Sequence, residues 1–306
     1  MSPMKKTFSM FLAAGLACAT MMSGTDAKSD GETNGGGTAA IYKNIPPDQI
    51  EFLSTNERIV SVSSSGSPSA IWEALEHGER VECLACIPAV APLLYDTNAK
   101  NREIAAWWLR RRVFGVFGPG EVYETTLATL KNDPNPTRRA YAANALGEFL
   151  LAPGIAACAE ALSKDSDADV RVAAAAALGR LNDEGGGSLA RALGDGEPKV
   201  RLAALKSVGH VNGFSDVASV ARLTGDGDAQ VRRRAVEVLD GLYAKDSVAS
   251  VLALAKSDPD ADVRIAACHA LMTFGDGSAR ATLESIAKDD KNGLVRDMAA
   301  IALRRV

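Results

Sequence analysis

The sequence has few of the residues from which most catalytic and metal sites are built. Its 306 residues include three histidines and five cysteines, and these form no cluster at metal-ligand spacing. The HExxH, GxSxG, Walker A and Rossmann glycine patterns are also missing. We therefore predict a protein without a catalytic centre, a metal or a cofactor.

Aromatic residues and net charge are low as well. Aromatics make up 5% of the chain, and alanine supplies much of its apolar content, which favours closely spaced helices. The formal net charge is −4, so nothing in the overall charge indicates a nucleic-acid partner or an acidic membrane.

A hydrophobic run of the signal-peptide kind lies near the N-terminus. Residues 1–27 contain Lys5 and Lys6, then an apolar run from Phe8, then small residues. This layout is typical of a secretory signal peptide and is too short for a membrane span. We predict export to the periplasm or cell envelope of a bacterium.

Two cleavage positions fit the small-residue rule, after Ala27 and after Ala19. A lipoprotein acylated at Cys18 is the alternative, although Gly15 stands where a lipobox would place leucine.

Three domains are expected along the chain. Signal peptide 1–27 is followed by 28–66, a flexible tether and irregular segment rich in glycine and serine. The packed domain is expected over 67–306, opening with Ser67 as N-cap and Pro68 at the first helical position.

The most abundant pattern is an internal repeat. Seven segments share an aspartate followed six residues later by an arginine, and successive arginines are 30 to 37 residues apart. The pairs are Asp96/Arg102, Asp133/Arg139, Asp165/Arg171, Asp195/Arg201, Asp226/Arg232, Asp258/Arg264 and Asp290/Arg296.

Each unit is expected to form two helices. The second helix should begin at an N-cap four residues before the arginine: Asn98, Asn135, Asp167, Glu197, Asp228, Asp260 and Asn292. Within 168–181 the apolar residues recur at helical period, while Ala175 and Ala176 are expected to act only as helix formers. Such pairs must stack to bury their apolar faces, which predicts an all-α, right-handed α-solenoid of seven helix pairs.

The repeat resembles HEAT repeats, and most closely the short phycobilin-lyase (EZ) type. The resemblance covers 88–306 and is strongest from 153 onward, whereas Asn101 and Arg138 replace the valine before the arginine in the first two units. The matching residues of the third unit are Leu162, Asp165, Val170, Arg171, Ala174, Ala177, Leu178 and Gly179.

The resemblance implies a structural role for the Asp/Arg pairs. In HEAT solenoids they form a ladder, in which each arginine joins acids of its own and adjacent units. A planar guanidinium with five donors suits that role. A metal-dependent hydroxylase family also uses HEAT-like repeats, but this sequence lacks the His-Glu pairs of its iron site.

Cys83 and Cys86 form a CxxC pair. Haem attachment would need histidine at the next position, where Ile87 stands. In an oxidising envelope we expect a local disulfide or two free thiols, with a redox function as the alternative.

Aromatic and arginine residues gather in 102–126, which we call the N-terminal patch. Tryptophan, tyrosine and arginine dominate binding hot spots, so this patch is our candidate for partner binding. The alternative is that its aromatics seal the end of the solenoid. The candidate residues are Trp107, Trp108, Arg110, Arg111, Phe114, Phe117 and Tyr123.

The sequence therefore predicts a non-catalytic exported scaffold or adaptor that binds a protein partner on the solenoid surface. A lyase-like role in chromophore attachment, or a chaperone role, is one alternative. An accessory of envelope redox proteins acting through the CxxC is another. At the C-terminal repeat, Arg304 and Arg305 would cap the stack, or the side bearing Met298 and Ile301 would meet a partner or a second copy.

Overall fold

A computed structural model describes residues 54–114, 120–183 and 186–306. All of them belong to one compact unit, Pro46–Val306. The proposed signal peptide, Cys18 and residues 28–53 of the expected tether lie outside the described residues, as does Phe117.

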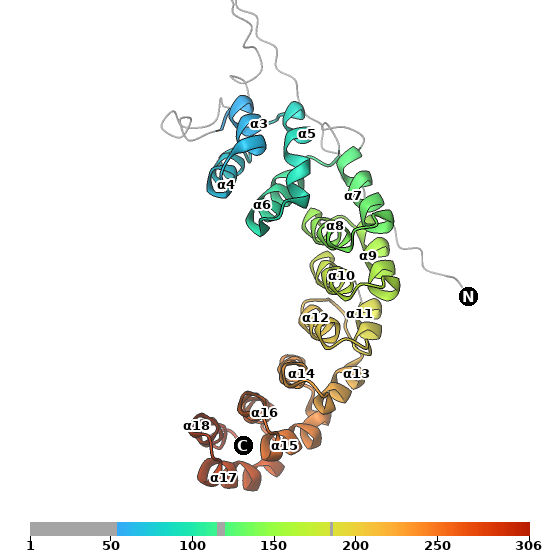
Figure 1. Cartoon of the computed structure of the whole chain (residues 1–306). Coiled ribbons are helices and arrows are strands. Elements are labelled where there is room, and N and C mark those ends of the chain that lie inside the picture. The colour runs from blue at the N-terminus through green and yellow to red at the C-terminus, as the bar shows by residue number, and fades with distance from the viewer. Residues whose placement is uncertain (1–53, 115–119, 184–185) are drawn as a thin grey trace, which may run out of the picture. The chain divides into compact units, whose positions relative to one another are not determined.

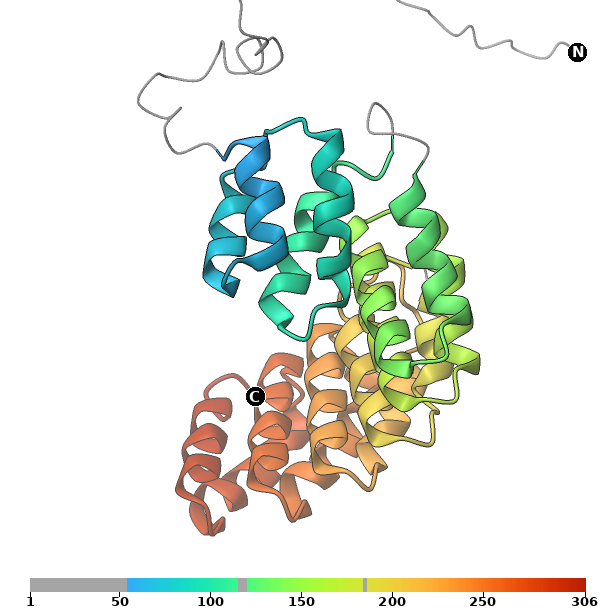
Figure 2. The same cartoon turned by 45° about the horizontal axis from the view of Figure 1, so that its top comes forward.

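The described residues contain α-helices and short 3-10 turns but no strand, which confirms the all-α solenoid (Figure 1). The helices alternate between two layers, and successive helices of each layer lie side by side (Figures 1 and 2). The first-helix layer comprises α3 (Asn56–Ser65), α5 (Ile87–Val90), α7 (Glu121–Asn132), α9 (Pro153–Lys164), α11 (Gly187–Ala192), α13 (Val217–Arg222), α15 (Val248–Ser257) and α17 (Arg280–Asp289). The second-helix layer comprises α4 (Pro68–Glu76), α6 (Ala99–Leu109), α8 (Pro136–Phe149), α10 (Ala168–Leu181), α12 (Pro198–Val208), α14 (Ala229–Gly241), α16 (Ala261–Phe274) and α18 (Gly293–Ala302).

The seven repeat units form the pairs from α5/α6 to α17/α18, and η turns complete the shorter first helices. These turns are η1 (Leu84–Cys86), η2 (Ala91–Tyr95), η5 (Leu223–Gly225), η6 (Lys245–Ser247) and η7 (Gly277–Ala279). Within the described part of the chain, every helix falls short of the length and apolar character that a bilayer span requires.

The second helices of the seven units begin where the repeat predicts. Each of the seven expected residues is the N-cap, and all but Glu197 accept a hydrogen bond from a backbone N–H of their own helix. The repeat aspartate prepares this start, because its carboxylate accepts a hydrogen bond from the N–H of the N-cap residue at 2.6 to 2.9 Å in every unit.

The expected boundary at residue 67 is wrong, because residues 56–65 form helix α3 and add an eighth pair, α3/α4. Thr55 caps α3 by accepting a hydrogen bond from the N–H of Arg58. Ile59 is fully buried in the contact between α3 and its neighbours. Serine-rich segments have weak helix propensity, and here tertiary packing outweighs it. The start of α4 agrees with the prediction, since Ser67 caps it and Pro68 opens it.

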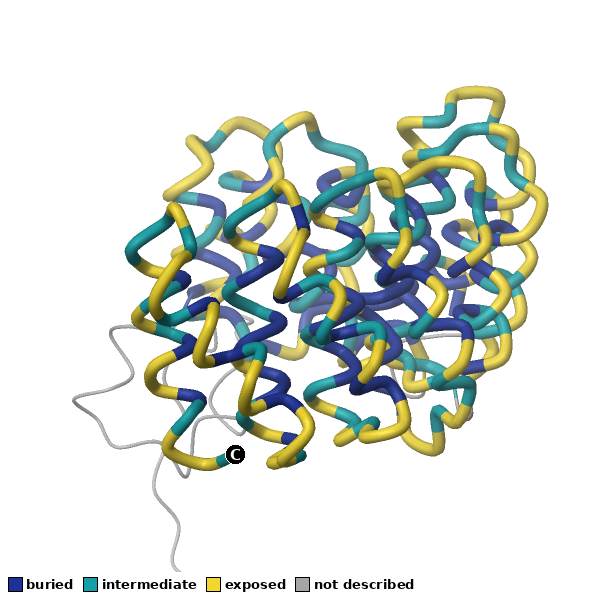
Figure 3. The backbone as a smooth tube through the Cα atoms, turned by 90° about the horizontal axis from the view of Figure 1, so that it is seen from below, coloured by how far each residue is buried: buried dark blue, intermediate teal, exposed yellow. Residues whose placement is uncertain are grey.

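Small side chains let the second helices pack closely. Helix α10 contacts α8, α9 and α12, so most of its circumference is covered. Ala175 is therefore fully buried rather than a mere helix former, as are Leu205, Val236 and Cys268 at the same position of later units. Figure 3 shows the buried stretches where helices face one another and the exposed ones at the turns.

Helices α8 and α10 approach each other closely at a glycine. A Cβ atom at Gly147 would lie 2.8 Å from the Cα of Ala177 and 3.0 Å from its Cβ. Both neighbours belong to backbone or to a rigid methyl group, so neither can move aside.

We expect Gly147→Ala to destabilise the protein by about 1–3 kcal/mol through overpacking, although alanine is the better helix former. Gly241→Ala is the matched control, because Gly241 also lies in a helix and a Cβ there meets nothing within 4 Å. The control should stabilise by up to about 1 kcal/mol. Urea unfolding of both variants measures the difference, and equal effects would contradict the close-packing argument.

Candidate functional site

The repeat arginines and aspartates form a continuous hydrogen-bonded ladder over five joints between units. At each joint the Nε and Nη2 of the arginine donate to the two carboxylate oxygens of the next unit's aspartate, at 2.7 to 3.0 Å. The rungs are Arg139–Asp165, Arg171–Asp195, Arg201–Asp226, Arg232–Asp258 and Arg264–Asp290.

Within its own unit, each arginine binds backbone rather than the aspartate side chain. In the third unit the Nη1 of Arg171 donates to the carbonyls of Asp165 and Ser166, at 3.0 and 3.2 Å. The expectation that each arginine joins the acid of its own unit is therefore corrected. The carboxylate of Asp165 is directed to Arg139 of the preceding unit and to the backbone N–H of Asp167.

The rungs are largely shielded from water, with side chains 2 to 15% exposed. The hydrogen bond from Arg139 holds the pKa of the Asp165 carboxyl below its ordinary value. The same bond raises the pKa of Arg139. Both groups therefore stay charged near neutral pH, which suits a structural network and leaves these arginines occupied.

The ladder is broken at the joint between α6 and α8, which we call the first joint. Arg102 keeps the carbonyl contacts of its own unit, to Asp96 and Thr97. The next aspartate, Asp133, is bound by Arg138 at 2.8 Å instead. Among the described residues, the Nε and Nη2 of Arg102 make no hydrogen bond, and its guanidinium lies 3.9 Å from the centre of the Tyr141 ring.

Two cavities flank the first joint. One, of about 280 Å³, lies between the second helices and is lined by Arg102, Glu103, Tyr141, Asn144, Glu148 and Arg180, among others. The other, of about 310 Å³, lies towards the first helices and is mostly apolar, with Leu84, Ile87, Pro88, Tyr95 and Val113 in its lining. The hydroxyl of Tyr95 is buried without a hydrogen-bond partner among the described residues, and the guanidinium of Arg138 stacks 4.3 Å from its ring.

The N-terminal patch divides into core and surface residues. Trp108 and Tyr123 are each 1% exposed and belong to the core. The indole N–H of Trp108 donates to the carbonyl of Gly78 at 2.9 Å, and Tyr123 packs against Phe149. These two residues therefore follow the alternative expectation, in which aromatics fill the N-terminal end of the stack.

The remaining described patch residues are accessible. Trp107 and Arg110 are half-buried, and Arg111 is exposed and pairs with Glu79 at 2.8 Å. Glu103, one turn before Trp107, lines the polar cavity, so the two share a face of α6. Phe114 is exposed but leans on Tyr123, towards α7. The candidate residues thus point in two directions.

Arg112, which is not among the binding residues predicted from the sequence, is buried and holds several backbone carbonyls of this region. Its Nη1 donates to the carbonyl of Trp108, and its Nη2 donates to the carbonyls of Gly78, Glu79 and Val81. Its guanidinium also stacks 3.7 Å from the Trp108 ring. Burial lowers the pKa of Arg112 to about 10. The sequence does not distinguish Arg112 from its neighbours Arg110 and Arg111, because only the fold shows which of the three side chains turns inward.

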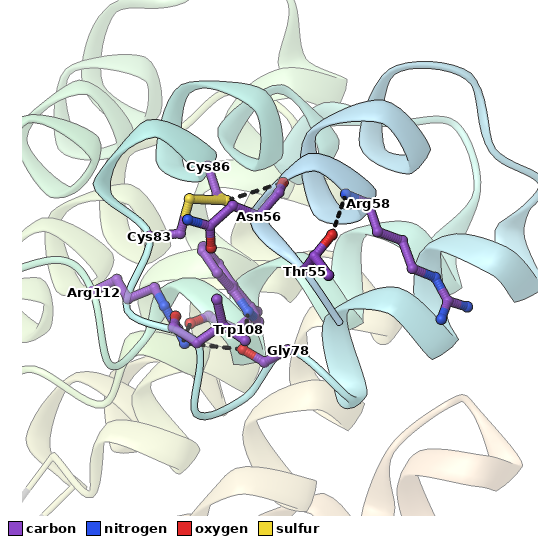
Figure 4. Close-up of a disulfide and its surroundings, with 9 residues drawn as sticks. Thr55, Asn56, Arg58, Gly78, Cys83, Cys86, Trp108 and Arg112 are labelled. Atoms are coloured by element: carbon purple, nitrogen blue, oxygen red, sulfur yellow. Dashed lines mark hydrogen bonds between the residues drawn. A yellow bond between two sulfur atoms is a disulfide. The ribbon is translucent and has the colours of Figure 1, made fainter. Parts of the chain in front are cut away.

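Cys83 and Cys86 form a disulfide beside α3 (Figure 4). They follow the loop from Gly78 to Val81, whose carbonyls accept hydrogen bonds from Trp108 and Arg112. Both cysteines are at most 2% exposed. The sulfur of Cys86 lies 3.7 Å from the carbonyl oxygen of Asn56. The bond thus closes a tight local loop at η1, which packs against α3.

At the other end of the stack, α18 leaves apolar side chains in contact with water. Ile301 is 46% exposed, while Met298 is half-buried. Arg304 and Arg305 are exposed beside them, and Arg280 binds the carbonyl of Val306. The arginines that would cap the stack and the apolar residues that would meet a partner are thus both accessible at this end, on α18 and just after it.

The chain belongs to the HEAT-repeat proteins. The family model for HEAT repeats matches residues 123–186, 155–225 and 218–304, which together span more than half of the chain. No curated protein matches it in sequence.

Solved structures share the fold at low sequence identity. YibA of Escherichia coli is 19% identical with a TM-score of 0.57, over 82% of this chain and 93% of YibA. A chain in the complex of Kap95p with RanGDP is 12% identical with a TM-score of 0.57, over 81% of this chain and 38% of that one. The CpcE–CpcF complex of phycocyanin lyase from Nostoc is 18% identical with a TM-score of 0.41, over 71% and 86%. For YibA and the chain of the Kap95p complex, whose TM-scores exceed 0.5, the likeness at these identities shows the fold alone.

The ladder generates a stability prediction. Arg201→Ala should lower the free energy of unfolding by about 2–4 kcal/mol, because it leaves the buried Asp226 carboxylate without its main partner. Arg222→Ala, at an exposed arginine whose side chain donates a hydrogen bond to Ser219, should cost less than about 0.5 kcal/mol. Thermal and urea unfolding measure both, and equal losses would show that the rung contributes little.

The lowered pKa of Asp165 makes its rung dependent on pH. A carboxyl whose pKa is lower in the folded than in the unfolded chain stabilises the fold above about pH 4, and this stabilisation is lost as the pH falls through the folded value. Asp165→Asn should therefore destabilise strongly at pH 7 and progressively less as the pH falls below about 4. Urea unfolding across this range tests it. Asp169→Asn, in an exposed pair with Lys199, is the control and should change little at any pH.

Proposed function

We propose that the chain is a non-catalytic, exported scaffold that binds a protein partner on its second-helix layer, at the first joint. The observation that carries this proposal is the polar cavity between α6 and α8. Arg102, Tyr141 and Arg180 line it, and Trp107 lies on the same face of α6. Tyrosine and arginine in the lining, with an accessible tryptophan one turn from the lining residue Glu103, are residue types that dominate protein-binding hot spots.

Neither free thiol of the described residues is available as a nucleophile. Burial raises the pKa of both free thiols, Cys158 and Cys268, to about 12, so neither is a nucleophile near neutral pH. In 54–114, 120–183 and 186–306, no group of three or more histidine, cysteine, aspartate or glutamate side chains is placed to hold a metal ion.

The disulfide supports an oxidising compartment and a structural use of the CxxC. Disulfides persist in exported proteins, which agrees with the signal-like N-terminus. Thiol–disulfide exchange needs access to the sulfur under attack, and both sulfurs belong to buried residues. The role of accessory to envelope redox proteins is therefore the weaker alternative.

Affinity capture from the native envelope tests the proposal. The bait is the chain recovered from the envelope fraction, where N-terminal sequencing checks cleavage after Ala27. The double variant Trp107→Ala/Arg111→Ala should reduce recovery of the partner at least tenfold, because it removes two accessible anchors. The matched control is Trp72→Ala, at a half-buried tryptophan of α4. Undiminished recovery with the double variant would move the binding face elsewhere.

A further inference from the structure

At the first joint, the Nε and Nη2 atoms of Arg102, which we call its fork, do not bind the carboxylate of the next unit's aspartate. At five other joints, Nε and Nη2 of the repeat arginine hold the next unit's aspartate. Arg296 lacks such a partner because no described unit follows it, and it keeps only the carbonyl contact to Asp290. Arg102 differs from both cases, because a unit follows it and that unit's aspartate is bound elsewhere.

Two residues of α8 account for this difference. Arg138 occupies the position where five later units have a buried valine, and it binds Asp133 itself. Tyr141 occupies the position held by Ala173 and Ala203 in the next units, and its ring lies under the guanidinium of Arg102. Stacking engages the face of a guanidinium and leaves its edge, with Nε and Nη2, able to donate in the plane.

Arg102 lines the polar cavity, which is large enough and polar enough to hold a ligand group. Its volume of about 280 Å³ is several times the roughly 30 Å³ that one water molecule occupies in the liquid. Asn144 contributes an amide to the lining, which can donate a further hydrogen bond. Glu148 is neutralised by Arg180 at 3.2 Å, which leaves Glu103 as the lining acid without an ion pair among the described residues.

We propose that Arg102 binds a carboxylate of the partner, which takes the place of the missing rung. This inference rests on the proposed function and names the group that the site recognises. A carboxylate fits because its two oxygens match the fork, as the five occupied rungs show within the same chain. A phosphate carries more negative charge and would be repelled more strongly by Glu103.

The first experiment observes the fork directly in the purified protein. Sodium acetate is titrated against sodium chloride at constant ionic strength, and the Nε–H resonances of the arginines are followed by NMR. The Arg102 resonance, assigned by its loss in Arg102→Lys, should shift and saturate. That of Arg171, whose Nε already donates to Asp195, should stay fixed. A shift at Arg102 no larger than that at Arg296, which has an open fork but does not line this cavity, would overturn the proposal.

The second experiment separates the sources of the carboxylate. Three pentapeptides of glycine and serine are compared: one with a central glutamate and capped ends, its glutamine counterpart, and the glutamine peptide with a free C-terminus. Binding of the first alone assigns an acidic side chain, and binding of the third alone assigns a chain terminus. If the capped glutamine peptide binds as well as both others, the carboxylate site is excluded.

Matched variants link this binding to the fork. Arg102→Lys keeps the charge but loses the two-pronged geometry, and it should weaken binding of the preferred peptide about tenfold. Arg171→Lys, in a filled rung, should leave that binding unchanged. Partner capture then distinguishes two failures. If Arg102→Lys retains the partner while the Trp107→Ala/Arg111→Ala variant loses it, the carboxylate site is wrong and the scaffold function stands.

Discussion

The bond between one unit's arginine and the next unit's aspartate couples the folding of each helix pair to its stacking. The aspartate carboxylate accepts from the preceding arginine and from the N–H of its own N-cap residue, and its carbonyl accepts from its own arginine. One residue therefore sets the start of the second helix and its register against the previous pair. The rest of the solenoid depends on this link, because a helix pair cannot bury its apolar face alone.

Close helix packing and the ladder reinforce each other. Small residues such as Gly147 and Ala177 bring the backbones of second helices together, which places successive turns within reach of one arginine side chain. Shielding of the rungs in turn strengthens their charge-assisted hydrogen bonds. Alanine and the Asp/Arg pairs therefore both serve the close stacking of helix pairs. The short distance between second helices also explains why aromatic residues are scarce outside the N-terminal region.

The first joint departs from this pattern, and it also carries the features that favour binding. Arg138 and Tyr141 replace small or apolar residues, the ladder is interrupted, and cavities lie on both sides. Nearby, hydrogen bonds from Arg112 and the Cys83–Cys86 disulfide, rather than an Asp/Arg rung, fix the loop before α5. The region thus has its own stabilising contacts, and it is where we propose that a partner binds.

The sequence by itself determined the seven repeat helix pairs, the N-caps of their second helices and the Asp/Arg positions from Asp96 to Arg296, because these rest on local spacing that repeats in every unit. It also marked the first joint, through Asn101 and Arg138 in the valine column. Only the tertiary structure decided that 56–65 is helical, that Ala175 is buried, and that Trp108 and Arg112 turn inward while Trp107 stays accessible. These outcomes depend on contacts with neighbouring units, and such contacts leave no period in the sequence.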